Sequence, residues 1–148
     1  MKHFLFLLCI VFFAACSGND NDDFTPQTEE DIINYIEENN LNAQRTNSGL
    51  YYVINNEGSG PRPTSTSNVT VAYKGYFLDG TVFDQSATGI SFRLNQVIQG
   101  WTEGIQLFKE GGSGILLIPS QLGYGNSGRG GIPGGAALVF DIELISVN

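Results

Sequence analysis

The sequence predicts an α+β domain with a mostly antiparallel β-sheet. Segments with alternating apolar and polar residues, typical of half-buried strands, account for much of the chain after residue 50. One short helix-like segment follows several of these strands, so the repeated strand–helix order of a parallel βαβ core does not occur. The 148 residues suffice for one compact domain with an appendage.

Residues 1–15 have the composition of a secretion signal peptide. Lys2 precedes an apolar run that is too short to span a membrane permanently. The stretch FAAC, which ends at Cys16, resembles the lipobox of bacterial lipoproteins. The resemblance implies lipidation of Cys16 and anchoring in the envelope of a Gram-negative bacterium, at the periplasmic or surface side of the outer membrane. An ordinary cleaved signal peptide is the alternative.

Acidic residues are concentrated near the N-terminus. Residues 16–27 are polar and are expected to form a flexible tether. Residues 16–42 contain eight acidic residues and no Lys or Arg, whereas the chain from residue 43 onward has seven acidic and six basic residues. Because this negative charge repels phosphate groups, we expect no nucleic-acid partner. The acidic run also resembles surface-export signals of some lipoproteins; a solvated spacer is the alternative.

A helix is expected over residues 28–42. Thr25 or Thr28 can cap its start, and acidic residues in its first turn match the positive end of the helix dipole. Its apolar stripe is formed by Ile32, Ile33 and Ile36. The sequence leaves open whether this stripe packs on the main domain or on a partner.

The main domain is expected over residues 46–148 and begins with strands. The stretch LYYVINNEG alternates like a strand and ends in a turn-rich segment. In NVTVAYKGYFLDGTVFD, two alternating segments flank Asp79-Gly80, which is a strong reverse-turn signal and therefore predicts a hairpin. A separate alternating piece runs from Ile90 to Leu94.

One short helix and two further strands complete the predicted domain. The run SGILLIP predicts a buried strand, and AALVFDIELISV alternates as a strand with one apolar face. Between them, residues 121–135 contain seven glycines and no periodicity, and so long an irregular loop is usually functional or disordered. The helix ends at Gly111-Gly112, and apolar residues recur along it at spacings of three, four and three, at Ile98, Trp101, Ile105 and Phe108.

Several kinds of chemistry are excluded by residue content. His3 is the only histidine and lies in the expected signal peptide, so Ser-His-Asp sites, Cys-His sites and most zinc sites are not expected. The stretch GYGNSG matches the dinucleotide fingerprint, but RGGIPGG follows it and cannot begin the required helix. No second carboxylate is marked as a partner of Asp84 for glycoside hydrolysis. We expect no metal and no cofactor.

Five motifs carry a resemblance to a known family. VAYKGYFLDGTVFD, QVIQGWTEG, GYG, GGIP and ALVFDIEL occur in the order and approximate spacing that resemble FKBP-type peptidyl-prolyl cis/trans isomerases. The resemblance covers about residues 48–147. It implies a curled antiparallel sheet wrapped around one short helix, with an apolar pocket that takes the proline of a substrate. One departure is Pro133-Gly134-Gly135, where the family often has a proline pair.

The resemblance also implies roles for individual residues. Trp101 would be the floor under the prolyl ring, while the Ile98 backbone N–H and the Tyr124 hydroxyl would each hold a substrate carbonyl. Asp84 would form a hydrogen bond inside the pocket, with Tyr73 as the expected partner. The other substrate-binding side chains would be Phe83, Phe92, Val97, Ile132 and Phe140. Core packing is the alternative for each aromatic residue taken alone.

The expected function is isomerisation of X-Pro bonds in exported or envelope proteins. The partners would be proline-containing segments and unfolded exported proteins, the membrane through Cys16, and macrolide ligands of the family. Two alternatives are a module of the same fold that holds such segments without useful turnover, and a structural envelope subunit that docks through the acidic helix.

Overall fold

The computed structural model describes residues 23–148. The expected signal peptide, Cys16 and the first part of the expected tether lie outside the described residues. The chain contains two α-helices in this range, α1 (Glu29–Glu38) and α2 (Gln99–Ile105), and two single-turn 3-10 helices, η1 (Leu94–Gln96) and η2 (Ser120–Leu122). The strands are β1 (Gln44–Arg45), β2 (Tyr51–Asn56), β3 (Asn68–Phe77), β4 (Val82–Arg93), β5 (Ser113–Ile118) and β6 (Leu138–Val147).

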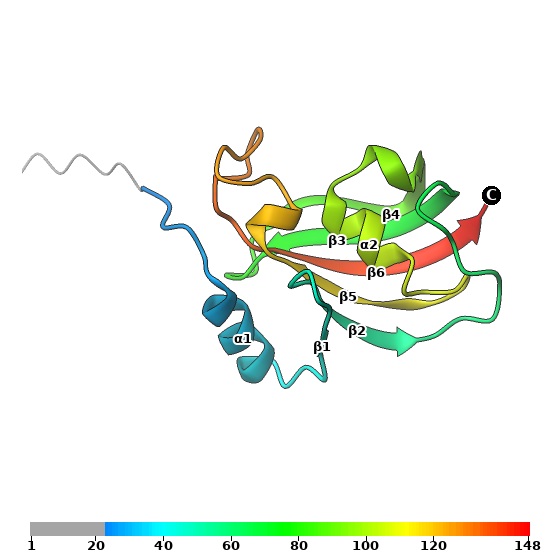
Figure 1. The fold of residues 1–148 in the computed structure, drawn as a ribbon, viewed down its shortest axis with the longest axis horizontal. Coiled ribbons are helices and arrows are strands. Elements are labelled where there is room, and N and C mark those ends of the chain that lie inside the picture. Colours follow the sequence, from blue (N-terminus) through cyan, green and yellow to red (C-terminus); the bar gives the residue numbers. More distant parts are fainter. Residues whose placement is uncertain (1–22) are drawn as a thin grey trace, which may run out of the picture.

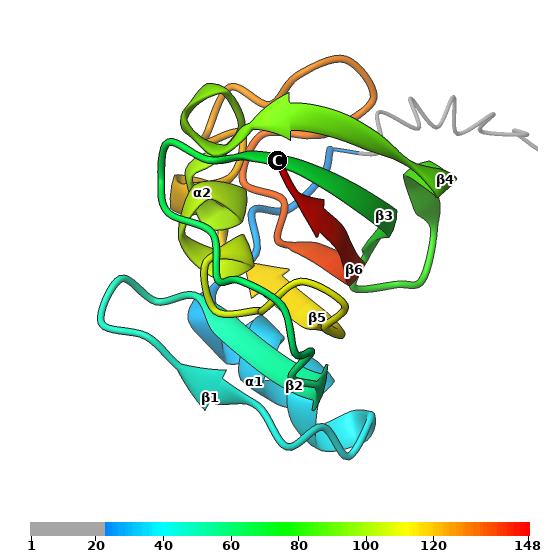
Figure 2. The same cartoon turned by 90° about the vertical axis from the view of Figure 1, so that its right-hand side faces the viewer.

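The six strands form one antiparallel sheet in the order β1-β2-β5-β6-β3-β4. The sheet curls around α2, and α1 lies on the opposite side (Figures 1 and 2). The predicted fold class, an antiparallel α+β sheet around one short helix with a second helix before it, is confirmed.

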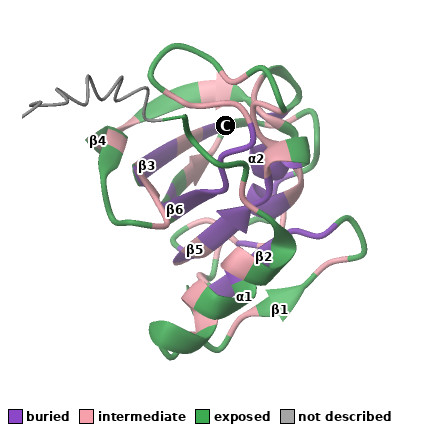
Figure 3. Cartoon of the chain, turned by 90° about the vertical axis from the view of Figure 1, so that its left-hand side faces the viewer, coloured by how far each residue is buried: buried purple, intermediate pink, exposed green. Residues whose placement is uncertain are grey.

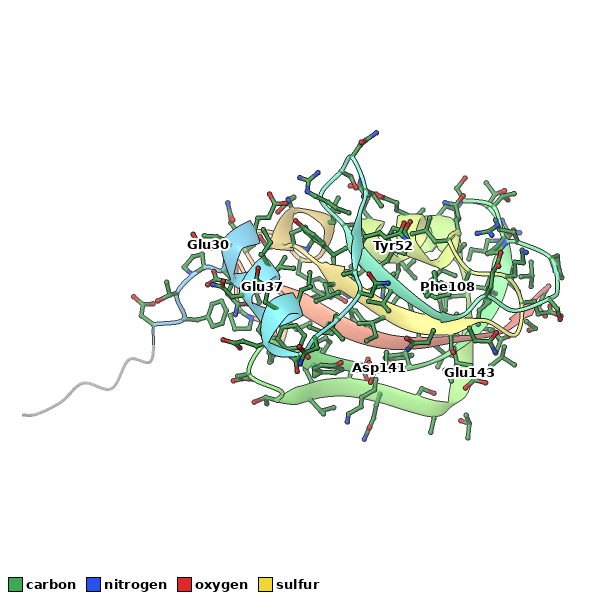
Figure 4. The ribbon with its side chains drawn as sticks, turned by 90° about the horizontal axis from the view of Figure 1, so that it is seen from below. Glu30, Glu37, Tyr52, Phe108, Asp141 and Glu143 are labelled. Carbon is green, nitrogen blue, oxygen red and sulfur yellow. The ribbon has the colours of Figure 1, made fainter. Side chains whose placement is uncertain are left out.

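The C-terminal half of β5 is buried on both faces because a helix covers each side of the sheet there (Figure 3). On β5, Leu116 and Ile118 belong to the cluster under α2, whereas Leu117 between them belongs to the cluster under α1. All three side chains are fully buried. β6 keeps the predicted alternation, and its outward positions Asp141 and Glu143 are exposed beyond the edge of α1 (Figure 4).

Two glycines allow α2 to lie close against β5. A Cβ atom on Gly100 would be 2.5 Å from Ile118 Cγ2, and one on Gly104 would be 2.6 Å from Leu116 Cδ1. Both distances are shorter than side-chain packing permits, so at these points the helix backbone lies directly against the side chains of Ile118 and Leu116. The α-helix ends at Ile105, earlier than expected, and Phe108 reaches the core from the following turn, where its N–H donates to the Ile105 carbonyl.

The β3–β4 hairpin forms at the predicted turn, where Gly80 has a φ of +88° and its N–H donates to the Phe77 carbonyl. β4 is one long strand rather than the two pieces expected. Its pairing with β3 skips several residues between Ser86 and Ile90, where Gly89 has a φ of +89°. A β-bulge at this glycine lets the strand bend and continue. A second, smaller register shift lies between Gly75 and Tyr76, near the turn.

The N-terminal helix docks on the sheet of its own domain. Thr28 caps it in a capping box with Asp31, and Ile32 is 1% exposed against the outer face. The Glu29 carboxylate accepts hydrogen bonds from Arg45 (2.6 Å) and from the Tyr51 hydroxyl (2.8 Å), which tie the helix to β1 and β2. The helix ends at Glu38, short of the expected residue 42, and the two-residue strand β1 was not predicted.

Within residues 23–148, no helix combines the length and the hydropathy that a membrane crossing requires.

Candidate functional site

A cavity of about 710 Å³ opens where the start of α2 meets β3, β4, β6 and the loop of residues 121–135. Its wall includes Tyr73, Phe83, Asp84, Val97, Ile98, Trp101, Tyr124, Ile132 and Phe140, together with Ile90, Gln96, Arg129 and Gly131. Strands on one side and the loop on the other therefore bring together residues that are up to 67 positions apart, from Tyr73 to Phe140.

The indole of Trp101 is held by aromatic rings around it. Its ring centroid lies 5.0 Å from that of Tyr73 and 5.1 Å from that of Phe140, and both pairs are edge to face. Such geometry is the favourable one for aromatic pairs. The Trp101 side chain is 6% exposed, and its buried Nε1 has no hydrogen-bond acceptor among the described residues. Ring packing rather than hydrogen bonding therefore fixes the indole beneath the cavity.

A glycine in β3 makes room for the aromatic wall. A Cβ atom on Gly75 would be 2.7 Å from Phe140 and 2.8 Å from Phe83, so any larger residue would displace both rings. With glycine there, Phe83 and Phe140 pack edge to face with centroids 5.5 Å apart. The apolar side of the cavity thus depends on a position that has no side chain.

The polar side of the cavity is organised by Asp84. The Tyr73 hydroxyl donates a 2.6 Å hydrogen bond to Asp84 Oδ2, and the Gln85 backbone N–H donates to Oδ1 at 2.9 Å. Burial, together with the hydrogen bond to the Asp84 carboxylate, raises the pKa of Tyr73 well above its ordinary value. The hydroxyl therefore stays protonated at physiological pH and remains a donor.

The start of α2 is fixed by its own backbone. The Ile98 carbonyl accepts hydrogen bonds from the N–H groups of Trp101 (3.0 Å) and Thr102 (3.1 Å), and the Thr102 hydroxyl bonds to the Leu94 carbonyl. The N–H groups of a helix's first turn have no acceptor within the helix. Ile98 is therefore held as the N-cap of α2 at the cavity wall.

The glycine-rich loop is folded back on itself. Arg129 and Ile132 exchange two backbone hydrogen bonds of 2.9 Å, so the tip is a tight hairpin. Gly128 has a φ of +65°, and a Cβ atom on Gly134 would be 1.9 Å from the Asn126 carbonyl. These glycines allow the two legs of the loop to touch, and this places Ile132 and Arg129 in the cavity wall.

Comparison with known proteins decides the family. A model of the FKBP-type peptidyl-prolyl cis-trans isomerase family matches residues 60–145. The chain belongs to this family. A Neisseria meningitidis protein named probable FKBP-type peptidyl-prolyl cis-trans isomerase FkpA is 50% identical over 109 residues, which cover 71% of this chain and 40% of that protein. Escherichia coli FkpA is 46% identical over 108 residues, with the same shares.

Solved structures agree with the family of this FKBP-type chain. The crystal structure of FkpA from Escherichia coli matches with a TM-score of 0.75 and 39% identity, covering 80% of this chain and 58% of the other. A peptidyl-prolyl cis-trans isomerase structure from Pseudomonas syringae matches with a TM-score of 0.73 and 34% identity, covering 84% and 99%. The FKBP-type chain spans about two fifths of the length of the curated relatives it matches.

One residue expected in this FKBP-type pocket, Phe92, contacts the Trp101 ring but is not part of the described wall. Phe92 packs against Trp101 with centroids 5.2 Å apart. Its register opposite Val69 on β3 places it beyond the bulge at Gly89, nearer the core. Sequence reasoning missed Ile90, Gln96, Arg129 and Gly131 as wall residues. For Arg129 and Gly131 the reason is that the hairpin that brings the loop tip to the cavity leaves no periodic pattern.

Proposed function

We propose that this protein is a peptidyl-prolyl cis-trans isomerase that acts on X-Pro bonds. The observation that carries the proposal is the aromatic cavity with Trp101 packed at its base and polar donors at its rim. Rotation about an X-Pro bond breaks amide resonance and meets a barrier of roughly 18–20 kcal/mol. An uncatalysed turn takes on the order of tens of seconds.

The chemistry needs neither proton transfer nor a covalent intermediate. A twisted amide has a less polarised carbonyl than a planar one, so a water-poor aromatic cavity disfavours the planar ground state more than the transition state. Only this difference accelerates the reaction. Each tenfold gain in rate takes about 1.4 kcal/mol of preferential stabilisation, so a few kcal/mol give a useful catalyst.

Each residue has a proposed role. The prolyl ring rests on the Trp101 indole, with Phe83 and Phe140 at its sides. The Ile98 N–H and the Tyr124 hydroxyl bind carbonyls of the substrate on either side of the proline. Asp84 orients the Tyr73 hydroxyl through the 2.6 Å hydrogen bond between them and thereby holds the wall in place.

A protease-coupled proline-peptide assay tests the proposal. Purified protein should accelerate the cis-to-trans step, and Trp101→Leu should reduce the acceleration. Glu143→Gln serves as the control, because this exposed side chain lies on the outer face of β6, away from the cavity wall. Peptide or macrolide binding without acceleration would instead favour a holding module.

We further propose that the protein acts on exported proteins while anchored through a lipidated Cys16. The support is the sequence of residues 1–16 alone. Cys16→Ala should remove the increase in protein mass that lipidation causes, and should release the protein from the membrane fraction. The alternative of a docking subunit is less favoured, because Ile32 of the apolar stripe of α1 is 1% exposed against its own sheet, which leaves Ile33, at 38% exposed, on the surface.

A further inference from the structure

The segment just before α1 contacts the far end of the cavity loop. The Gln27 N–H donates to the Gly135 carbonyl, and the Gln27 Oε1 accepts from the Ala137 N–H, both at 2.9 Å. Gln27 and Ala137 are 110 residues apart in the chain. One residue thus holds two backbone groups, one on either side of Ala136, where the loop of residues 121–135 joins β6.

Gly135 is fitted to this contact. A Cβ atom at position 135 would be 2.6 Å from Pro26 Cβ, and the residue has a φ of +82°. A larger residue would be strained in that backbone conformation and would push Pro26 away. Pro26, Gln27 and Gly135 therefore form one packed unit, which we name the loop clamp.

The loop clamp connects to the cavity wall through the backbone. The Gly135 N–H donates to the Gly125 carbonyl at 2.9 Å, and the Gly125 N–H donates to the Ser120 carbonyl at 2.8 Å. Gly125 is thus held through both its N–H and its carbonyl, and Tyr124 lies directly before it. Ile132 lies three residues before Gly135, within the same hydrogen-bonded hairpin.

The docked helix holds the clamp in place. Thr28, next to Gln27, is the N-cap of α1, and its capping box with Asp31 fixes the direction in which the chain enters the helix. The helix is in turn held to the sheet by buried Ile32 and by the hydrogen bonds of Glu29. Gln27 is therefore positioned by the sheet's outer face, although it acts on the loop.

We propose that Gln27 is a positioning residue of the isomerase site, which holds the cavity loop ready to bind substrate. Seven glycines give this loop unusually great conformational freedom to lose when it is ordered. The contacts of the loop clamp remove part of this conformational freedom before a peptide binds, and pre-organisation of this kind strengthens binding. This inference rests on the proposed isomerase function.

Two substitutions of Gln27 in the full chain test the clamp. Gln27→Ala removes the acceptor for the Ala137 N–H, and should raise KM about threefold to tenfold with little change in kcat. Gln27→Glu keeps an oxygen at the same position, and should restore KM to within about twofold of the wild-type value. Glu30→Gln is the control, because Glu30 lies on the exposed side of α1 (Figure 4).

Amide hydrogen exchange provides a readout that does not depend on turnover. In Gln27→Ala, the N–H groups of Ala137, Gly135 and Gly125 should exchange at least tenfold faster, while amides of β5 stay protected. Gly135→Ala should give the same pattern by displacing Pro26. Unchanged KM and unchanged exchange in Gln27→Ala would overturn the proposal. A wild-type protein without turnover would refute the isomerase function, while faster exchange would still support the clamp.

Discussion

The Tyr73 hydroxyl and the Asp84 carboxylate share a hydrogen bond of 2.6 Å between adjacent strands at the cavity wall. A hydrogen bond to an ionised group contributes about 1.5–3 kcal/mol, more than a neutral one. Because the Tyr73 ring also packs edge to face against Trp101, this bond sets the orientation of two wall residues together.

Asp84→Ala should lower kcat/KM about tenfold or more while the fold persists. The substitution leaves the half-buried Tyr73 hydroxyl without its acceptor, so the ring loses its fixed orientation. Steady-state kinetics and circular dichroism on the same samples provide the measurement. Tyr73→Phe keeps the ring and serves as the matched variant. An Asp84→Ala protein that is folded and fully active would remove Asp84 from the site.

Phe140→Ala should cost about 3–5 kcal/mol of the free energy of unfolding, as large core truncations do. Phe140 is 4% exposed and packs against both Trp101 and Phe83. Phe140→Leu preserves more volume, and should retain the fold yet lose most activity because the aromatic wall is interrupted. Urea unfolding and the isomerase assay separate the two effects. A fully active Phe140→Leu protein would show that the aromatic ring is dispensable.

The docking of α1 should weaken in acid. Hydrogen bonds from Arg45 and then from Tyr51 hold the pKa of Glu29 below its ordinary value of 4.5. A lowered folded-state pKa gives stability that is complete above the ordinary value and is lost as the pH falls through the folded value. The Tm difference between wild type and Glu29→Gln should therefore be present at pH 6 and shrink below about pH 4. A difference independent of pH would contradict this assignment.

Gly104→Ala should destabilise the protein by about 1 kcal/mol. Alanine gains about 1 kcal/mol over glycine in a helix, but overpacking a core typically costs about 1–3 kcal/mol. The added Cβ would lie 2.6 Å from Leu116 Cδ1, so the steric cost should exceed the gain. Gly131→Ala, with open space around its Cβ, is the control for unfolding measurements. A more stable Gly104→Ala protein would mean that Leu116 can move freely.

Arg129 should favour peptides that carry an acidic residue beside the proline. It lies on the cavity wall, where Asp84, the other charged wall residue, already accepts two hydrogen bonds. Exposed charge pairs contribute about 0.2–1 kcal/mol, so the preference should be about fivefold at most and should fade with added salt. Comparing Glu-Pro and Leu-Pro peptides on wild type and Arg129→Ala measures it. Equal ratios for the two proteins would exclude the effect.

The sequence predicted those elements whose side chains alternate or repeat. β6 has Leu138, Phe140, Ile142 and Leu144 on its inner face, and the pattern of the strand alone gives this face. The β3–β4 turn was predicted from the reverse-turn signal Asp79-Gly80. The bulge at Gly89 broke the alternation, so β4 was expected as two pieces, although pairing with β3 resumes beyond it.

The site was predictable only in part. Its residues were found from motifs and not from the alternation that predicted the strands. Motifs drew attention to Trp101, Tyr73 and Asp84, and the structure brings these three together. The contact of Gln27 with Gly135, and the position of Arg129, depend on how distant backbone segments meet. Hydrogen bonds of this kind involve main-chain atoms that every residue carries, and therefore leave no signal in residue types.

The burial of β5 on both faces has a consequence for the register in which the strand pairs with its neighbours. A strand with aliphatic residues on both sides can slide by one position without exposing apolar surface, so hydrophobicity alone selects no alignment. Gly114 restricts the register instead, because a Cβ atom at this position would be only 1.9 Å from the Val53 carbonyl oxygen. A one-residue slip would bring Ser113 or Ile115 against that oxygen, so the glycine selects the register of β5 against β2.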